Sequence, residues 1–144
     1  MDTNWIVHKH ISFLEMYQEK IAPVFKKIDL MLKTSGGFLT ETQVSEALNI
    51  SADEINQIMA EKKLCCLNIE SFLTVMELGS SYICNIYKRE LECGSPYVYS
   101  PENIAYIYGI DISAVCEACV SLGVKEITAY TLPDVMAQIT IYTD

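Results

Sequence analysis

Positive charge is scarce in this sequence. Ten Lys and Arg residues face nineteen Asp and Glu residues, so the formal net charge of the 144-residue chain is −9. Residues 90–144 hold Lys125 as their single Lys or Arg, against eight acidic residues. Because nucleic-acid phosphates and anionic membranes repel an acidic protein, this balance disfavours both as partners, most of all for the last third of the chain.

Long apolar runs are also missing. No stretch approaches the roughly 20 uncharged residues that a membrane-spanning helix needs, so we expect no membrane partner. The first five residues lack the basic and then apolar layout of a secretory signal. We therefore expect a cytoplasmic protein, in which the six cysteines are reduced thiols, most of them buried.

Recognisable catalytic and cofactor motifs are absent from the sequence. It has no glycine-rich phosphate loop, no His-Glu-x-x-His, no Gly-x-Ser-x-Gly and no acidic calcium loop. Cys116 and Cys119 form a Cys-x-x-Cys, but no second close pair at zinc-finger spacing completes the four ligands of a structural zinc. His8 and His10 have no identifiable nucleophile beside them. We expect no enzyme activity, no catalytic residue, no cofactor and no metal.

The composition that remains suits a folded, mainly α-helical protein. Apolar residues make up 51% of the chain and charged residues 20%, enough to bury a core in one domain or two small ones. Residues that interrupt regular structure concentrate at 34–37 and 93–96. These breaks predict an N-terminal helical segment (residues 1–35), a first unit with a long C-terminal helix (36–93) and a second unit (94–144).

The N-terminal segment repeats apolar residues at sevenfold spacing, which predicts an amphipathic helix over residues 4–33. Pro23 falls inside it, so we expect a kink or two helices that meet near Ile21. The apolar stripe has two interpretations: it packs on its own domain, or it forms the seam of a homodimer. The residues of such a seam are Val7, Ile11, Leu14, Ile21, Phe25, Ile28 and Leu32.

Residue classes then repeat at an offset of 60 positions. Thr40 and Ser100 are typical helix N-caps before acidic or proline-led helix starts. Asn49 and Gly109, which tolerate a left-handed backbone, stand where each short helix must turn sharply. Ser51 and Asp111 can cap the helix that follows. The repeat therefore predicts two copies of one helix, turn and helix.

Both copies resemble the helix-turn-helix motif, over residues 41–62 and 101–122. The apolar positions of the motif are Val44, Leu48, Ile50, Ile55 and Ile58 in the first copy and Ile104, Tyr108, Ile110, Val115 and Ala118 in the second. Short extended stretches follow at residues 64–69 and 124–130, either β wings or simple connections. The resemblance implies two pseudo-repeated, winged-helix-like units, a scaffold that serves many functions.

Two functions compete for this scaffold. The resemblance implies a DNA-binding regulator in which the second helix of the first copy reads bases with Ser51, Asn56 and Gln57 and holds phosphates with Lys62 and Lys63. The acidity of both second helices favours instead a cytoplasmic regulatory or adaptor protein that contacts another protein. The acidic, aromatic surface that would meet a basic partner includes Tyr97, Tyr99, Tyr106, Tyr108, Glu102 and Glu117.

Overall fold

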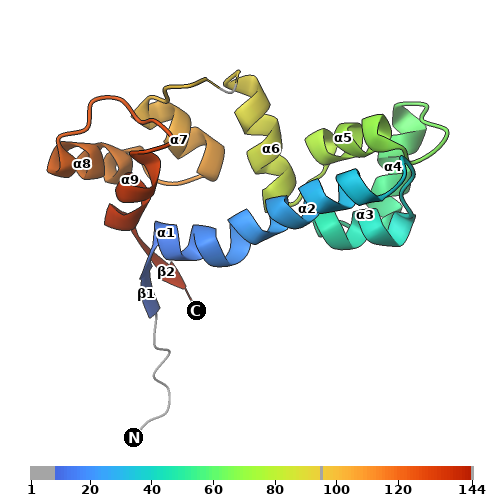
Figure 1. Cartoon of the computed structure of the whole chain (residues 1–144), viewed down its shortest axis with the longest axis horizontal. Helices are drawn as coiled ribbons and strands as arrows, with labels where there is room; N and C mark the ends of the chain where they lie inside the picture. Colours follow the sequence, from blue (N-terminus) through green and yellow to red (C-terminus); the bar gives the residue numbers. More distant parts are fainter. Residues whose placement is uncertain (1–8, 95, 144) are drawn as a thin grey trace, which may run out of the picture. The chain divides into compact units, whose positions relative to one another are not determined.

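A computed structural model describes residues 9–94 and 96–143, and for residues 9, 142 and 143 the backbone only (Figure 1). The described chain is mainly helical, which confirms the mainly α part of the predicted fold class. Its contacts fall into two compact units. Unit 1 comprises Met1–Lys20 and Pro96–Asp144, and unit 2 comprises Ile21–Ser95. This division differs from the three segments predicted at residues 35 and 93, because the start of the chain packs with its end.

Unit 2 is built from helices only. They are α2 (Ala22–Thr34), α3 (Glu41–Leu48), α4 (Ala52–Glu61), α5 (Ile69–Leu78) and α6 (Tyr82–Glu92) (Figure 1). Each turns an apolar side toward a shared core. The buried side chains include Ile28 from α2, Val44 and Leu48 from α3, Ile55 and Ile58 from α4, Phe72, Val75 and Met76 from α5, and Ile83 and Ile86 from α6.

The helix ends in unit 2 follow from local side-chain hydrogen bonds. Thr40 and Gln43 form a capping box at the start of α3, where the Gln43 amide donates to the Thr40 hydroxyl (3.1 Å) and the Thr40 amide donates to Gln43 Oε1 (2.8 Å). α3 ends at Asn49, whose φ of 56° is left-handed. Ser51 then caps α4 by accepting from the amide of Glu54.

Unit 1 joins both ends of the described chain. Strand β1 (Lys9–Ser12) pairs antiparallel with β2 (Thr140–Thr143), with Ile11 opposite Ile141 (Figure 1). The helices of this unit are α1 (Phe13–Met16), α7 (Pro101–Tyr108), α8 (Ile112–Leu122) and α9 (Leu132–Gln138). Phe13 is fully buried, with its ring 5.5 Å from that of Tyr108. The Phe13 amide also donates to the carbonyl of Ile139 at 2.7 Å.

The predicted helical character of the N-terminal segment is wrong for residues 9–12, which form a strand. Residues 9–12 are a strand because residues 140–143 offer them a backbone partner, which a local heptad pattern does not reveal. A π-helical turn, η1 (Tyr17–Ile21), follows α1, and α2 begins at Ala22 with Pro23 in its first turn. The break near Ile21 predicted from Pro23 is confirmed, because the missing amide of proline is tolerated at a helix start.

The same backbone hydrogen bonds recur in the two units at an offset of 60 residues. The Leu39 amide donates to the Leu67 carbonyl at 2.9 Å, and the Tyr99 amide donates to the Ile127 carbonyl at 2.8 Å. Left-handed residues follow the same offset, with Lys63 (φ 55°) matched by Gly123 (φ 68°). Two more backbone hydrogen bonds repeat in this way. The Ile50 amide donates to the Ser45 carbonyl as the Ile110 amide does to the Ala105 carbonyl, and the Leu64 amide donates to the Met59 carbonyl as the Val124 amide does to the Cys119 carbonyl.

The stretches predicted as wings or connections act as connections. Residues 64–69 contribute an isolated bridge between Asn68 and Phe38, and residues 124–130 one between Ile127 and Tyr99. In each unit the bridge joins the loop before the first helix of the repeat to the loop after the second. The strands described in this chain are β1 and β2, so neither stretch forms a two-stranded wing within the described residues.

Candidate functional site

The residues of the predicted dimer seam are divided between the two units. Ile21 and Ile28 are buried, 1% and 5% exposed, and so serve the core of the fold. Ile11 in β1 and Leu14 in α1 belong to unit 1, whereas Phe25 and Leu32 lie on α2 of unit 2, and all four are half-buried. Val7 lies outside the described residues. The row is not a continuous stripe on one helix, and Ile21 and Ile28 are already buried in the fold.

The residues predicted to read DNA lie on or beside α4, and the structure gives two of them local partners. Ser51 uses its hydroxyl to cap α4, and Gln57 donates from Nε2 to Glu61 Oε1 at 3.3 Å. Asn56, Lys62 and Lys63 are exposed. These residues are on an exposed part of α4 and its end, as expected. The side chains of Ser51 and Gln57, however, already form hydrogen bonds within this helix.

An acidic residue on α4 has a structural role that the sequence did not reveal. The Glu54 carboxylate accepts from the backbone amide of Ser80 at 2.7 Å and from the Ser80 hydroxyl at 2.8 Å. These charge-assisted bonds fix the start of α4 to the turn between α5 and α6. Asp53 and Glu61, which also belong to α4, are exposed. A phosphate backbone that approached α4 would meet these carboxylates together with the two lysines.

The cysteines do not assemble a metal site among the described residues. No group of three or more His, Cys, Asp and Glu side chains there could hold a metal ion. None of the six cysteines forms a disulfide, and Cys84 and Cys119 are buried whereas Cys65 and Cys66 are exposed. Burial raises the pKa of the Cys119 thiol, and the neighbouring Cys116 raises it further. Cys119 is thus a protonated core side chain, a poor metal ligand, since metals bind the thiolate.

The bridged loops give a second way to group the helices of unit 2. α2, a loop and α3 have the helix–loop–helix order of an EF-hand, and α4, a loop and α5 repeat it. A calcium-binding loop needs side-chain oxygens at its first, third, fifth and twelfth positions around a glycine at the sixth. With Gly37 (φ 98°) at the glycine position, those places hold Leu32, Thr34, Gly36 and Gln43. Leu32 and Gly36 offer no side-chain oxygen, so this loop lacks two of the ligands that calcium binding needs.

Large apolar side chains are exposed around the bridged loops of unit 1. We define the loop surface as Tyr97, Val98, Val120, Leu122 and Tyr130, which are exposed by 97%, 42%, 81%, 38% and 92%. These residues lie on the two loops that the Tyr99–Ile127 bridge joins and on the end of α8 that leads into one of them. Exposed large apolar side chains on bridged loops are candidates for an interaction site.

The charges near the loop surface are mostly acidic. Glu117 on α8 and Glu126 in the loop are exposed, as is Glu102 in the first turn of α7. Of the tyrosines that the sequence indicated, Tyr97 and Tyr106 are exposed, whereas Tyr99 and Tyr108 are half-buried. The ring of Tyr108 packs edge-to-face against two aromatic rings, those of Phe13 and Tyr17 (5.5 and 5.9 Å), and so belongs to the fold.

No family model, curated protein or solved structure matches this chain. Among the described residues, none of the helices combines the length and apolar character needed to cross a bilayer.

Proposed function

We propose that this chain is a non-enzymatic regulatory or adaptor protein of the cytoplasm that binds a basic segment of a partner protein through the loop surface of unit 1. The observation that carries the proposal is the exposure of Tyr97, Val120 and Tyr130 in a unit whose exposed side chains include Glu102, Glu117 and Glu126. Aromatic residues are the commonest anchors of protein interfaces because they bury a large area at a small entropic cost. Lys125 is the only Lys or Arg in residues 96–143, so a basic partner meets little repulsion there.

The helices can be grouped in two ways, and protein binding is compatible with both. Grouped as α3 with α4 and α7 with α8, the helices coincide with residues 41–62 and 101–122, for which the sequence predicts helix-turn-helix units. Grouped across the bridged loops, unit 2 is a pair of helix–loop–helix motifs, of which the first lacks calcium ligands. The hydrogen bond from the Leu39 amide to the Leu67 carbonyl favours the second grouping, since it ties together the two loops of that pair. Helical units of this kind bind amphipathic helices of partners.

The test is a titration of the whole chain with a fluorescein-labelled amphipathic peptide of Leu and Lys, about 18 residues or five helical turns long, followed by anisotropy. We expect saturable binding that weakens at least about tenfold in the double variant Tyr97→Ser/Tyr130→Ser. Phe38→Ser is the matched control, because Phe38 is 69% exposed on the equivalent loop of unit 2. Equal loss of affinity in both variants would argue against the loop surface.

DNA binding through the first repeat is the second candidate, and the exposure of Asn56, Lys62 and Lys63 on one helix and its end favours it. It predicts a gel shift on mixed genomic fragments that weakens steeply between about 50 and 200 mM salt. Lys62→Glu/Lys63→Glu should then abolish the shift. A shift that survives the double substitution would show that α4 is not the reading helix.

A further inference from the structure

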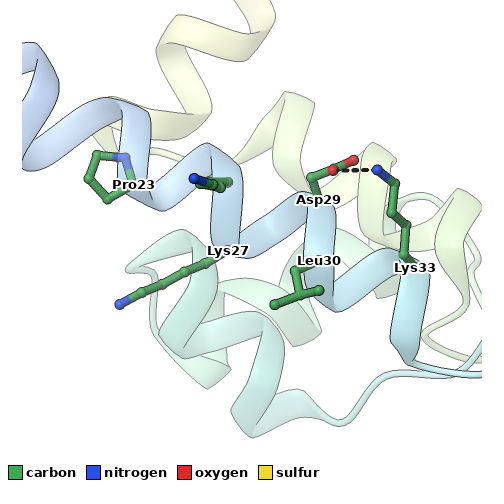
Figure 2. A pocket seen from close by; sticks show the side chains of 6 residues that line it. Pro23, Lys27, Asp29, Leu30 and Lys33 are labelled. Carbon is green, nitrogen blue, oxygen red and sulfur yellow. Dashed lines mark hydrogen bonds and ion pairs between the residues drawn. The ribbon is translucent and has the colours of Figure 1, made fainter.

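On the side of α2 opposite the buried Ile28, the exposed apolar residue Leu30 lies among three lysines. Leu30 is 62% exposed, although α2 belongs to a helical core. Figure 2 shows Pro23, Lys27 and Leu30 following one another along this side of α2. A hollow of about 440 Å³ runs along it, lined by Pro23, Lys26, Lys27, Asp29, Leu30 and Lys33, which we call the α2 face.

The charge of the α2 face is opposite to that of the chain. The whole protein carries −9, whereas the α2 face holds three lysines and one aspartate. Asp29 is already engaged, because Lys33 Nζ lies 2.7 Å from its Oδ2, as the dashed line in Figure 2 shows. Within the described residues, neither Lys26 nor Lys27 forms an ion pair of this kind. Their charges are therefore available to an acidic partner.

A second hollow of about 320 Å³ adjoins the first at Lys27. It is lined by Lys27 and Met31 of α2 and by Gln43, Glu46 and Ala47 of α3. A segment that covers Leu30 can thus extend toward Met31 and bury additional apolar area. An apolar centre inside a charged rim is the usual anatomy of a protein interface.

We propose that the α2 face binds an acidic amphipathic helix of a partner protein, whose apolar side covers Leu30 and Pro23 while its carboxylates meet Lys26 and Lys27. Charge complementarity supports this occupant. A short acidic helix meets the lysines of this face and, in the second hollow, the single carboxylate of Glu46, whereas an extended anionic membrane also meets the rest of a chain of net charge −9. One exposed leucine is also a small apolar area for membrane insertion. This site is in unit 2 and is independent of the loop surface of unit 1.

The experiment is an anisotropy titration of the whole chain with a labelled amphipathic peptide of Leu and Glu, of about 18 residues. We expect saturable binding that weakens on going from about 50 to 200 mM salt, because the charges are exposed and screened. Lys26→Glu/Lys27→Glu should weaken it at least about tenfold, and Leu30→Ser by a similar factor. The matched control is Lys62→Glu/Lys63→Glu, which makes the same change of charge at the end of α4 and should alter the affinity less than about twofold.

Three outcomes would overturn the proposal. The first is absence of binding at the lower salt concentration, and the second is equal weakening by the α2 and α4 double variants. The third comes from vesicles of phosphatidylcholine and phosphatidylserine: binding to them that depends on Lys26 and Lys27, with no binding of the Leu–Glu peptide, would assign the face to a membrane. Circular dichroism of each variant checks that the helices are retained. The Leu–Lys peptide serves as an internal reference, because the α2 variants should leave its binding unchanged.

Discussion

The substitution Gly79→Ala tests how tightly unit 2 is packed at the turn between α5 and α6. A Cβ atom at position 79 would lie 2.5 Å from the sulfur of Cys84 and 3.2 Å from the Val75 carbonyl oxygen. Gly79 has φ −66° and ψ 158°, a conformation that any residue adopts, so the backbone itself favours alanine by about 0.4–1 kcal/mol. Overpacking of a core costs about 1–3 kcal/mol, and this cost exceeds the backbone gain. We expect a net loss of about 1–2 kcal/mol.

Urea denaturation followed by circular dichroism measures this loss. With a slope of about 2 kcal/mol per molar urea, the midpoint should fall by about 0.5–1 M. The cause is isolated by repeating the substitution in a Cys84→Ala background, which removes the sulfur that the new methyl group meets. There Gly79→Ala should cost at least about 1 kcal/mol less, and this difference is the coupling free energy; the 3.2 Å contacts with the Cβ of residue 84 and the Val75 carbonyl oxygen remain. An equal cost with and without Cys84 would refute the steric reasoning.

Urea denaturation can also measure how further substitutions and a rise in pH change the free energy of unfolding. Lys63→Gly should raise the free energy of unfolding by about 1 kcal/mol, since Lys63 adopts a left-handed φ of 55°; no change would mean that the loop relaxes without cost. Ser45→Ala should lower it by about 1 kcal/mol, because the Ser45 hydroxyl donates to a backbone carbonyl at 2.7 Å. Ala105 occupies the position of Ser45 in unit 1, so the control Ala105→Ser should not lower the free energy of unfolding by this amount. Burial raises the pKa of the Cys84 and Cys119 thiols, so the folded protein retains protons that the unfolded chain releases above about pH 8.5. Stability should be constant below that pH and fall as the pH rises through the folded-state pKa values, and a constant urea midpoint up to about pH 10 would contradict this assignment.

The features that the sequence predicts best are those fixed by residues close together in the chain. Thr40 and Ser100 form their capping boxes with residues three positions further on, and the pattern of residue types is enough to locate them. Asn49 and Gly109 are left-handed as predicted, since few other residue types tolerate that conformation. Lys63 shares this conformation but has no such preference, so its sequence context does not indicate it.

The features that the sequence could not predict depend on distant contacts. Strand β1 exists because residues 140–143 pair with residues 9–12, and its apolar residues coincide with a heptad spacing that favours a helix. The burial of Tyr108 depends on Phe13, 95 positions earlier, whereas Tyr106 on the same helix is exposed. The loop surface arises in the same way, because the bridge between Tyr99 and Ile127 joins two loops that the sequence presents as separate connections.

Hydrogen exchange of the backbone amides, with and without a saturating amount of the Leu–Lys peptide, can locate the binding of a basic partner segment that we propose for the loop surface of unit 1. We expect slower exchange in residues 96–99 and 120–130 and unchanged exchange in α4. Slower exchange confined to α4 and residues 62–68, with none around the bridged loops of unit 1, would contradict it.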